Sequence, residues 1–134
     1  MELVPYVHFN GRCEEALNFY RDAVGGEITA IMKFSEAPQK EMIPPGAENH
    51  VMHASMRIGQ GTLLASDGVT DPNQQMSGFS LSVGVATVEE GQRVFKALSE
   101  GGKVTMPFEK TFWTTGFGML VDRFGVSWMV NVNH

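Results

Sequence analysis

The strongest constraint in this sequence is an internal repeat. Residues 14–28, EEALNFYRDAVGGEI, match residues 89–104, EEGQRVFKALSEGGKV, with an offset of one residue. Each copy contains a pair of glutamates, an aromatic residue and two consecutive glycines that begin six residues after Phe19 or Phe95. A match of this kind indicates that one structural unit occurs twice, so the fold must be built from two similar modules.

Both copies are predicted to be helices. Apolar side chains recur at the spacing of one helix face at Cys13, Leu17, Tyr20 and Val24 in the first copy and at Gly91, Val94, Phe95 and Leu98 in the second. Thr87 and Glu90 form a capping box that begins the second helix. The glycine pairs at 25–26 and 101–102 then supply the positive φ that commonly ends a helix.

Strand patterns surround each helix. Residues 3–9 precede the first helix and 79–85 the second, and each helix is followed by three strand-like segments. Gly59-Gln60-Gly61 is predicted to close a hairpin. The order predicts an α+β fold of two β-α-β-β-β modules, residues 1–67 and 78–134, joined by a linker at 68–77 within one domain. A loop is expected at 36–49, and His134 is expected to be a disordered terminus.

Composition narrows the class of protein. The length of 134 residues suits one compact domain. No segment approaches the ~20 apolar residues of a membrane span, so we expect no membrane partner. The net charge of −5, without a cluster of Lys or Arg, predicts no nucleic-acid partner. The N-terminus lacks the pattern of a secretory signal, and the single cysteine, Cys13, cannot form an internal disulfide, so we expect a cytoplasmic protein.

Two motifs make the pattern specific. The chain has FNGRCEEALNFY near its start and TFWTTGFGMLVDRFGVSWMVN near its end. With the tandem module order, these resemble the PhnB-like branch of the glyoxalase/bleomycin-resistance/dioxygenase superfamily over the whole chain. The resemblance implies a curved mixed sheet around a cleft that binds a small organic molecule, often in a homodimer. Some members of the branch are labelled ubiquinone methyltransferases, but the sequence contains no motif for a methyl donor.

The resemblance also implies where a metal would bind. Enzymes of the superfamily usually hold one divalent ion, a Lewis acid, on strands of both copies. The matching places in this chain are Pro5 or Leu3, Ser80 or Leu81, Ala65 and Met129. These residues are poor ligands for a hard divalent ion, so we predict no metal and no cofactor. The alternative is a lyase, isomerase or dioxygenase with relocated ligands drawn from His8, His50, His53, Glu48, Glu109 and Asp67.

The predicted ligand-binding residues are His53, Trp113, Phe117, Trp128 and Met129. In a strand, His53, Ser55 and Arg57 face one side and Met52, Ala54 and Met56 the other, and either row can face the cleft. His53 is therefore a ligand contact or an imidazole near the sheet surface. The aromatic residues are cleft residues or core residues. The nine methionines fill the core or line a pocket. Cys13, on the buried helix face, is predicted to be unreactive.

Overall fold

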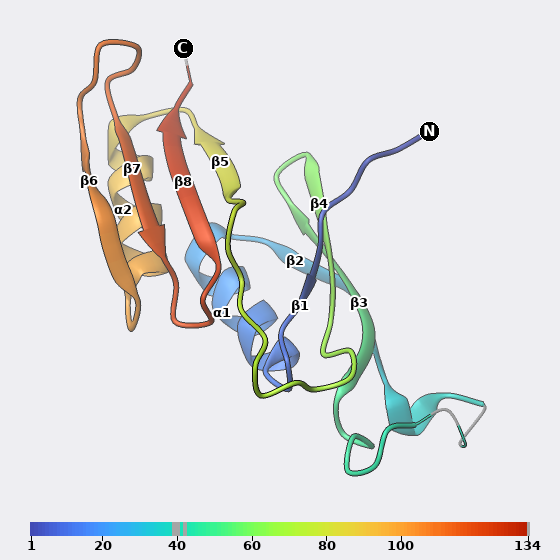
Figure 1. Ribbon diagram of the computed structural model, residues 1–134. Helices are drawn as coiled ribbons and strands as arrows, with labels where there is room; N and C mark the ends of the chain where they lie inside the picture. The colour runs from blue at the N-terminus through green and yellow to red at the C-terminus, as the bar shows by residue number, and fades with distance from the viewer. Residues whose placement is uncertain (39–40, 42, 134) are drawn as a thin grey trace. The chain divides into compact units, whose positions relative to one another are not determined.

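A computed structural model describes residues 1–38, 41 and 43–133 (Figure 1). The chain folds as two compact units, Met1–Gln74 and Gln75–His134. The boundary falls inside the segment predicted to be a linker. His134, expected to be disordered, lies outside the described residues, as do three residues of the expected loop at 36–49.

The first unit contains one helix and one four-stranded sheet, here called sheet A. Its elements are β1 (Tyr6–His8), α1 (Cys13–Val24), β2 (Glu27–Lys33), a short 3-10 helix (Phe34–Glu36), β3 (Val51–Ile58) and β4 (Gly61–Ser66). The strand order is β1-β4-β3-β2, with β1 parallel to β4 and the other neighbours antiparallel. The predicted hairpin at Gly59 is confirmed, because Ile58 pairs with Gly61.

The second unit repeats this arrangement in sheet B. Its elements are β5 (Leu81–Val85), α2 (Val88–Ser99), β6 (Lys103–Glu109), β7 (Phe117–Val121) and β8 (Ser127–Val132). The strand order is β5-β8-β7-β6, and β5 is again the strand that runs parallel to its neighbour. The predicted α+β fold of two β-α-β-β-β modules is therefore confirmed.

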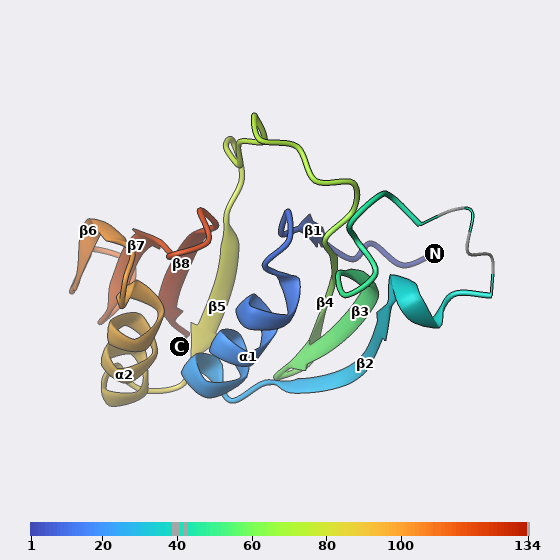
Figure 2. The same ribbon diagram turned by 90° about the horizontal axis from the view of Figure 1, so that it is seen from below.

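Helix α1 covers one face of sheet A (Figure 2). Cys13, Leu17 and Tyr20 are fully buried, as the periodicity predicted, and Val24 is half-buried. The Tyr20 ring lies 5.9 Å from the ring of Phe9, just after β1. The helix ends at Gly25, whose φ of 76° is the left-handed conformation that glycine adopts without strain.

A buried carboxylate joins the start of α1 to two strands of sheet A. The residue before the helix, Arg12, provides no side-chain cap. Instead, Asp67 Oδ1 accepts hydrogen bonds from the backbone N–H groups of Gly11 and Cys13, both at 2.8 Å. Its Oδ2 accepts one from Val51 N, also at 2.8 Å. Asp67 therefore caps the helix from the end of β4 and fixes the start of β3.

Burial and the same carboxylate both raise the pKa of the Cys13 thiol, as expected for the unreactive cysteine that the sequence predicts. The thiol is fully buried. Burial, with the negative charges of Asp67 and Glu14, raises the pKa of Cys13 from 9.0 to about 12. The thiol therefore stays neutral at physiological pH. Any stability that depends on the neutral thiol is present below pH 9 and is lost as the pH rises toward 12.

Helix α2 covers one face of sheet B. The threonine half of the predicted capping box is confirmed, because Thr87 Oγ1 accepts a hydrogen bond from Glu90 N at 3.1 Å. All four residues predicted for the buried helix face are buried. Gly118 of β7 allows the helix to approach closely, since a Cβ at this position would lie 2.5 Å from the Phe95 ring.

Sheet B also contains a buried carboxylate, in the turn between β7 and β8. Asp122 Oδ1 accepts hydrogen bonds from Phe124 N at 2.8 Å and Val126 N at 3.0 Å. Its Oδ2 accepts one from the indole Nε1 of Trp128 at 2.8 Å. Asp122 and Trp128 are 3% and 1% exposed, so the turn and the first core residue of β8 form one hydrogen-bonded unit.

We predict that Asp67→Asn destabilises the protein by about 1–3 kcal/mol, the cost of leaving a buried donor unpaired. An amide has one acceptor oxygen, so its NH₂ group would face one of the three backbone donors. Chemical denaturation of the full chain measures the change. The matched control is Asp71→Asn, an exposed residue whose carboxylate accepts a hydrogen bond from Asn73 N that an amide oxygen can also accept. Equal unfolding midpoints for the two variants would contradict this role of Asp67.

Candidate functional site

Each sheet has a second face, opposite its helix, which we call its open face. In β3, Ala54 and Met56 are buried, whereas His53 and Arg57 are exposed. In β7 and β8, half-buried and buried residues alternate without interruption. The alternation separates the core residues from those of the open face in both sheets.

The open face of sheet A carries a tyrosine between two histidines. Tyr6 OH lies 3.2 Å from His53 Nδ1. The Tyr6 ring is 5.0 Å from the His8 ring and 5.8 Å from the His53 ring. In the tautomer in which Nδ1 accepts the phenolic proton, the Nε2–H of His53 remains available as a donor. The arrangement can therefore present an oriented hydrogen-bond donor to a polar ligand.

Tyr6 was not among the residues predicted for the site. The prediction that the first strand spans residues 3–9 is wrong in its bounds, because β1 contains only Tyr6–His8. Pro5 precedes the strand. Its carbonyl extends the pairing with β4 by accepting a hydrogen bond from Leu64 N at 3.0 Å. The alternation in YVH was the available signal, since it places Tyr6 and His8 on one side and Val7 on the other.

The open face of sheet B is apolar, with a polar group at one end. Phe117 and Met129 lie on this face, and Phe117 pairs across the strands with Asn131. Trp113, in the segment before β7, packs edge-on against Phe117 with ring centroids 5.2 Å apart. Its Nε1 donates to Asn131 Oδ1 at 3.3 Å. Half of the Trp113 side chain is exposed, at 51%, so this surface can accept an apolar or aromatic group.

The predicted site residues therefore separate into three groups. His53 lies on the open face of sheet A, and Trp113, Phe117 and Met129 lie on the open face of sheet B. Trp128 lies among the core residues facing α2 and donates its indole N–H to Asp122. For Trp128 the core interpretation holds, because it alternates with Met129 along β8.

The residues at the superfamily's metal positions do not fit a hard divalent ion. Pro5 and Ser80 lie ahead of β1 and β5. Ala65 is fully buried, and Leu81 pairs with Trp128 on the helix-facing side of sheet B. Met129 lies on an open face, but a thioether is a poor ligand for such an ion.

Of the residues considered as relocated ligands, His8 and His53 lie beside Tyr6 on the open face of sheet A. Both oxygens of Asp67 are occupied by backbone N–H groups. His50 and Glu48 lie in the segment before β3, where their carbonyls accept hydrogen bonds from Phe34 N and Ser35 N. Among residues 1–38, 41 and 43–133, no group of three or more His, Cys, Asp or Glu side chains is arranged to hold a metal ion.

Comparisons with known proteins agree with this architecture. The model of the family described as 3-demethylubiquinone-9 3-methyltransferase matches residues 1–131. Protein YjdN of Escherichia coli is 36% identical over 98% of this chain and 95% of its own. The crystal structure of protein PA1353 from Pseudomonas aeruginosa is 41% identical, with a TM-score of 0.89 over 99% of this chain and 98% of that one.

Two further solved structures are similar to this chain. The first, from Bacillus cereus, is described as a putative 3-demethylubiquinone-9 3-methyltransferase, PhnB protein. It is 29% identical, with a TM-score of 0.84 over 99% of this chain and all of its own. The second, from Sphaerobacter thermophilus, is described as a member of the glyoxalase/bleomycin resistance protein/dioxygenase superfamily. It is 16% identical, with a TM-score of 0.60 over 99% of this chain and 98% of its own, and shares the fold.

The two helices were compared with the length and apolar character that a membrane-spanning helix needs. In the described part of the chain, no helix is both long enough and apolar enough to cross a membrane.

The repeated module, the two sequence motifs and the matches over nearly the whole chain all indicate the same family. The chain belongs to the family described as 3-demethylubiquinone-9 3-methyltransferase; it is similar to a PhnB protein and has the fold of a member of the glyoxalase/bleomycin resistance protein/dioxygenase superfamily.

Proposed function

We propose that this protein binds a small organic molecule on the open face of sheet B, without the divalent ion usual in its superfamily. The observation that carries the proposal is the half-exposed surface formed by Trp113, Phe117 and Met129 beside the Asn131 amide. A contiguous apolar surface with a polar group at one end is typical of a ligand-binding site.

The chemistry of this surface indicates the kind of ligand. Trp113 and Phe117 offer ring edges and faces that stack with a planar or aromatic group. Met129 has a flexible, polarizable side chain that adapts to irregular shapes. The indole N–H of Trp113 is directed at Asn131, so the tryptophan ring is held in place before a ligand arrives. We therefore propose a ligand with an apolar or aromatic body.

His53 has a separate role in this proposal. Its hydrogen bond with Tyr6 orients the imidazole on the open face of sheet A. An oriented donor suits a carbonyl, carboxylate or phosphate oxygen on a ligand. We propose that Tyr6 and His53 provide such a polar contact, and that His8, whose ring lies beside Tyr6, helps to hold the tyrosine in position.

We further propose that the chain acts as a cytoplasmic homodimer in which modules 1–67 and 78–134 make one domain. The sheets support self-association, because each ends in two outer strands, β1 and β2 in sheet A and β5 and β6 in sheet B. Unpaired strand edges are commonly covered by a partner.

Sedimentation of the full chain tests the dimer. We expect a mass of about twice 14.7 kDa at micromolar concentration. A monomer across the whole micromolar range would contradict the homodimer and would leave the ligand-binding proposal intact, because that proposal depends on side chains of sheet B alone.

Binding of an apolar aromatic probe tests the surface on sheet B. We use 1-anilinonaphthalene-8-sulfonate and measure its fluorescence on titration with the protein. Trp113→Ala and Phe117→Ala are expected to weaken binding by about tenfold each, the equivalent of ~1.4 kcal/mol, because each removes an aromatic contact.

The matched control is Phe79→Ala, since Phe79 is 45% exposed in the same unit but precedes β5. It should bind the probe as the wild type does. His53→Ala, on sheet A, is a second control and should also bind the probe as the wild type does. Equal affinity for Phe117→Ala and Phe79→Ala would contradict the proposed surface.

Substitutions of Met129 test the position at which the superfamily usually has a metal ligand. We predict that Met129→Leu, which nearly conserves volume, costs less than about 1.5 kcal/mol. Met129→Glu should cost more, because it puts a carboxylate on an apolar sheet face, where its pKa rises. That extra cost should diminish as the pH falls and the new carboxyl group takes up a proton.

Thermal unfolding measures these variants with and without zinc, nickel, manganese and iron(II). We expect none of the four ions to raise the melting temperature of the wild type. A gain of several degrees with one ion that disappears in Met129→Leu would show that a divalent metal binds beside this residue, and the metal-free proposal would then fail.

A further inference from the structure

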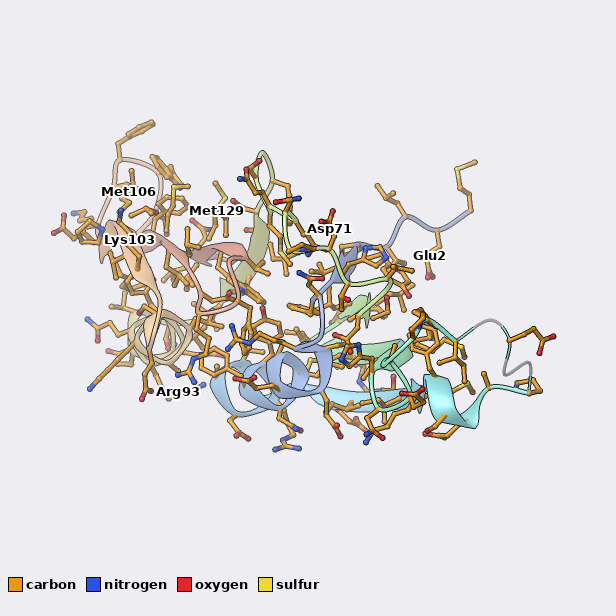
Figure 3. All side chains as sticks on the ribbon, turned by 60° about the horizontal axis from the view of Figure 1, so that its bottom comes forward. Glu2, Asp71, Arg93, Lys103, Met106 and Met129 are labelled. Carbon is orange, nitrogen blue, oxygen red and sulfur yellow. The ribbon has the colours of Figure 1, made fainter. Side chains whose placement is uncertain are left out.

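Three methionines form one row across the open face of sheet B. Met106 of β6 pairs with Met119 of β7, and Met119 pairs with Met129 of β8. Met106 is 44% exposed, and the other two are half-buried. Figure 3 shows Met106 and Met129 on the side of the strands away from α2. A third of the nine methionines in the chain therefore meet in a single row.

The spacing of this row allows the three sulfurs to converge. Neighbouring strands lie about 4.8 Å apart, and directly paired residues project from the same face. A methionine side chain has three rotatable bonds before its methyl group and adapts its sulfur position easily. An ion above Met119 is therefore within reach of the thioethers of both flanking residues, Met106 and Met129.

The donor type selects the ion. Thioether sulfur is a soft, uncharged ligand that favours Cu(I) over hard divalent cations. On β7 the row is flanked by Phe117 and Val121, which face the same side as Met119. An ion in such apolar surroundings loses hydration, and the electrostatic cost of this loss is smaller for a single charge than for a double charge.

We propose that Met106, Met119 and Met129 form a three-sulfur site for a soft monovalent cation, Cu(I), for which Ag(I) is a probe that does not change its oxidation state. The site does not rest on the proposed organic ligand, because it requires only the three thioethers. It also differs from the superfamily's divalent site in donor type and in the residues that provide the ligands.

The experiment follows the methionine methyl groups of the full chain by NMR, with ¹³C-methyl labelling and silver nitrate in chloride-free buffer. We expect the signals of Met106, Met119 and Met129 to shift together and to reach their end point at one equivalent of Ag(I). Met32, which is 42% exposed in sheet A, is the matched reference, and its signal should not move. Equal shifts of Met32 and Met106 would overturn the proposal, because they would show binding to any exposed thioether.

Variants distinguish Ag(I) binding at the methionine row from binding at other sulfur atoms. Met119→Leu keeps the apolar volume and removes the central sulfur, so Ag(I) affinity should fall by about tenfold or more. Met32→Leu should bind as the wild type does. Cys13→Ala should also retain the site, because the buried thiol is not part of it. Wild-type affinity in Met119→Leu, or loss of binding in Cys13→Ala, would overturn the proposal, and the methyl spectrum reports folding of each variant.

Discussion

One helix can cover only one face of a four-stranded sheet, and this constraint organises both units. Helix α1 lies on sheet A and α2 on sheet B, so each sheet has a core face and an open face. On the core face side chains are buried and glycines such as Gly118 allow close approach. On the open face a half-exposed aromatic or methionine side chain requires an explanation other than packing against the helix.

Register decides which residues reach the open face, because a slip of one residue exchanges the two faces of a strand. Two buried carboxylates fix the register. Asp67, just after the end of β4, accepts hydrogen bonds from the start of β3 and the start of α1. Asp122 accepts hydrogen bonds from the turn that leads into β8 and from the Trp128 indole. With Trp128 bonded to Asp122 in the core, Met129 is necessarily on the opposite side. The sulfur row and the ligand surface both follow from that placement.

Much of the fold could be predicted from the sequence, because it depends on local patterns. The repeat, the two helices and the β-α-β-β-β order occur as the sequence patterns predicted, with Thr87 as a cap. The site was less predictable. Asp67 contacts Cys13 across 54 residues, which no local pattern reveals. Tyr6 was overlooked because the first strand is only three residues long. Trp128 had two interpretations because composition alone does not tell a core aromatic from a cleft aromatic.

The central claim is that this chain retains the superfamily's architecture while its ligand surface works without a hard divalent ion. At the expected metal positions it has proline, alanine, leucine, serine and methionine, and its open faces present aromatic, thioether and imidazole groups. Elemental analysis of the full chain, purified without chelator, tests this claim directly. We predict less than a stoichiometric amount of zinc, nickel, manganese and iron. One equivalent of any of these metals, removed by chelator and restored on adding the ion back, would contradict the account.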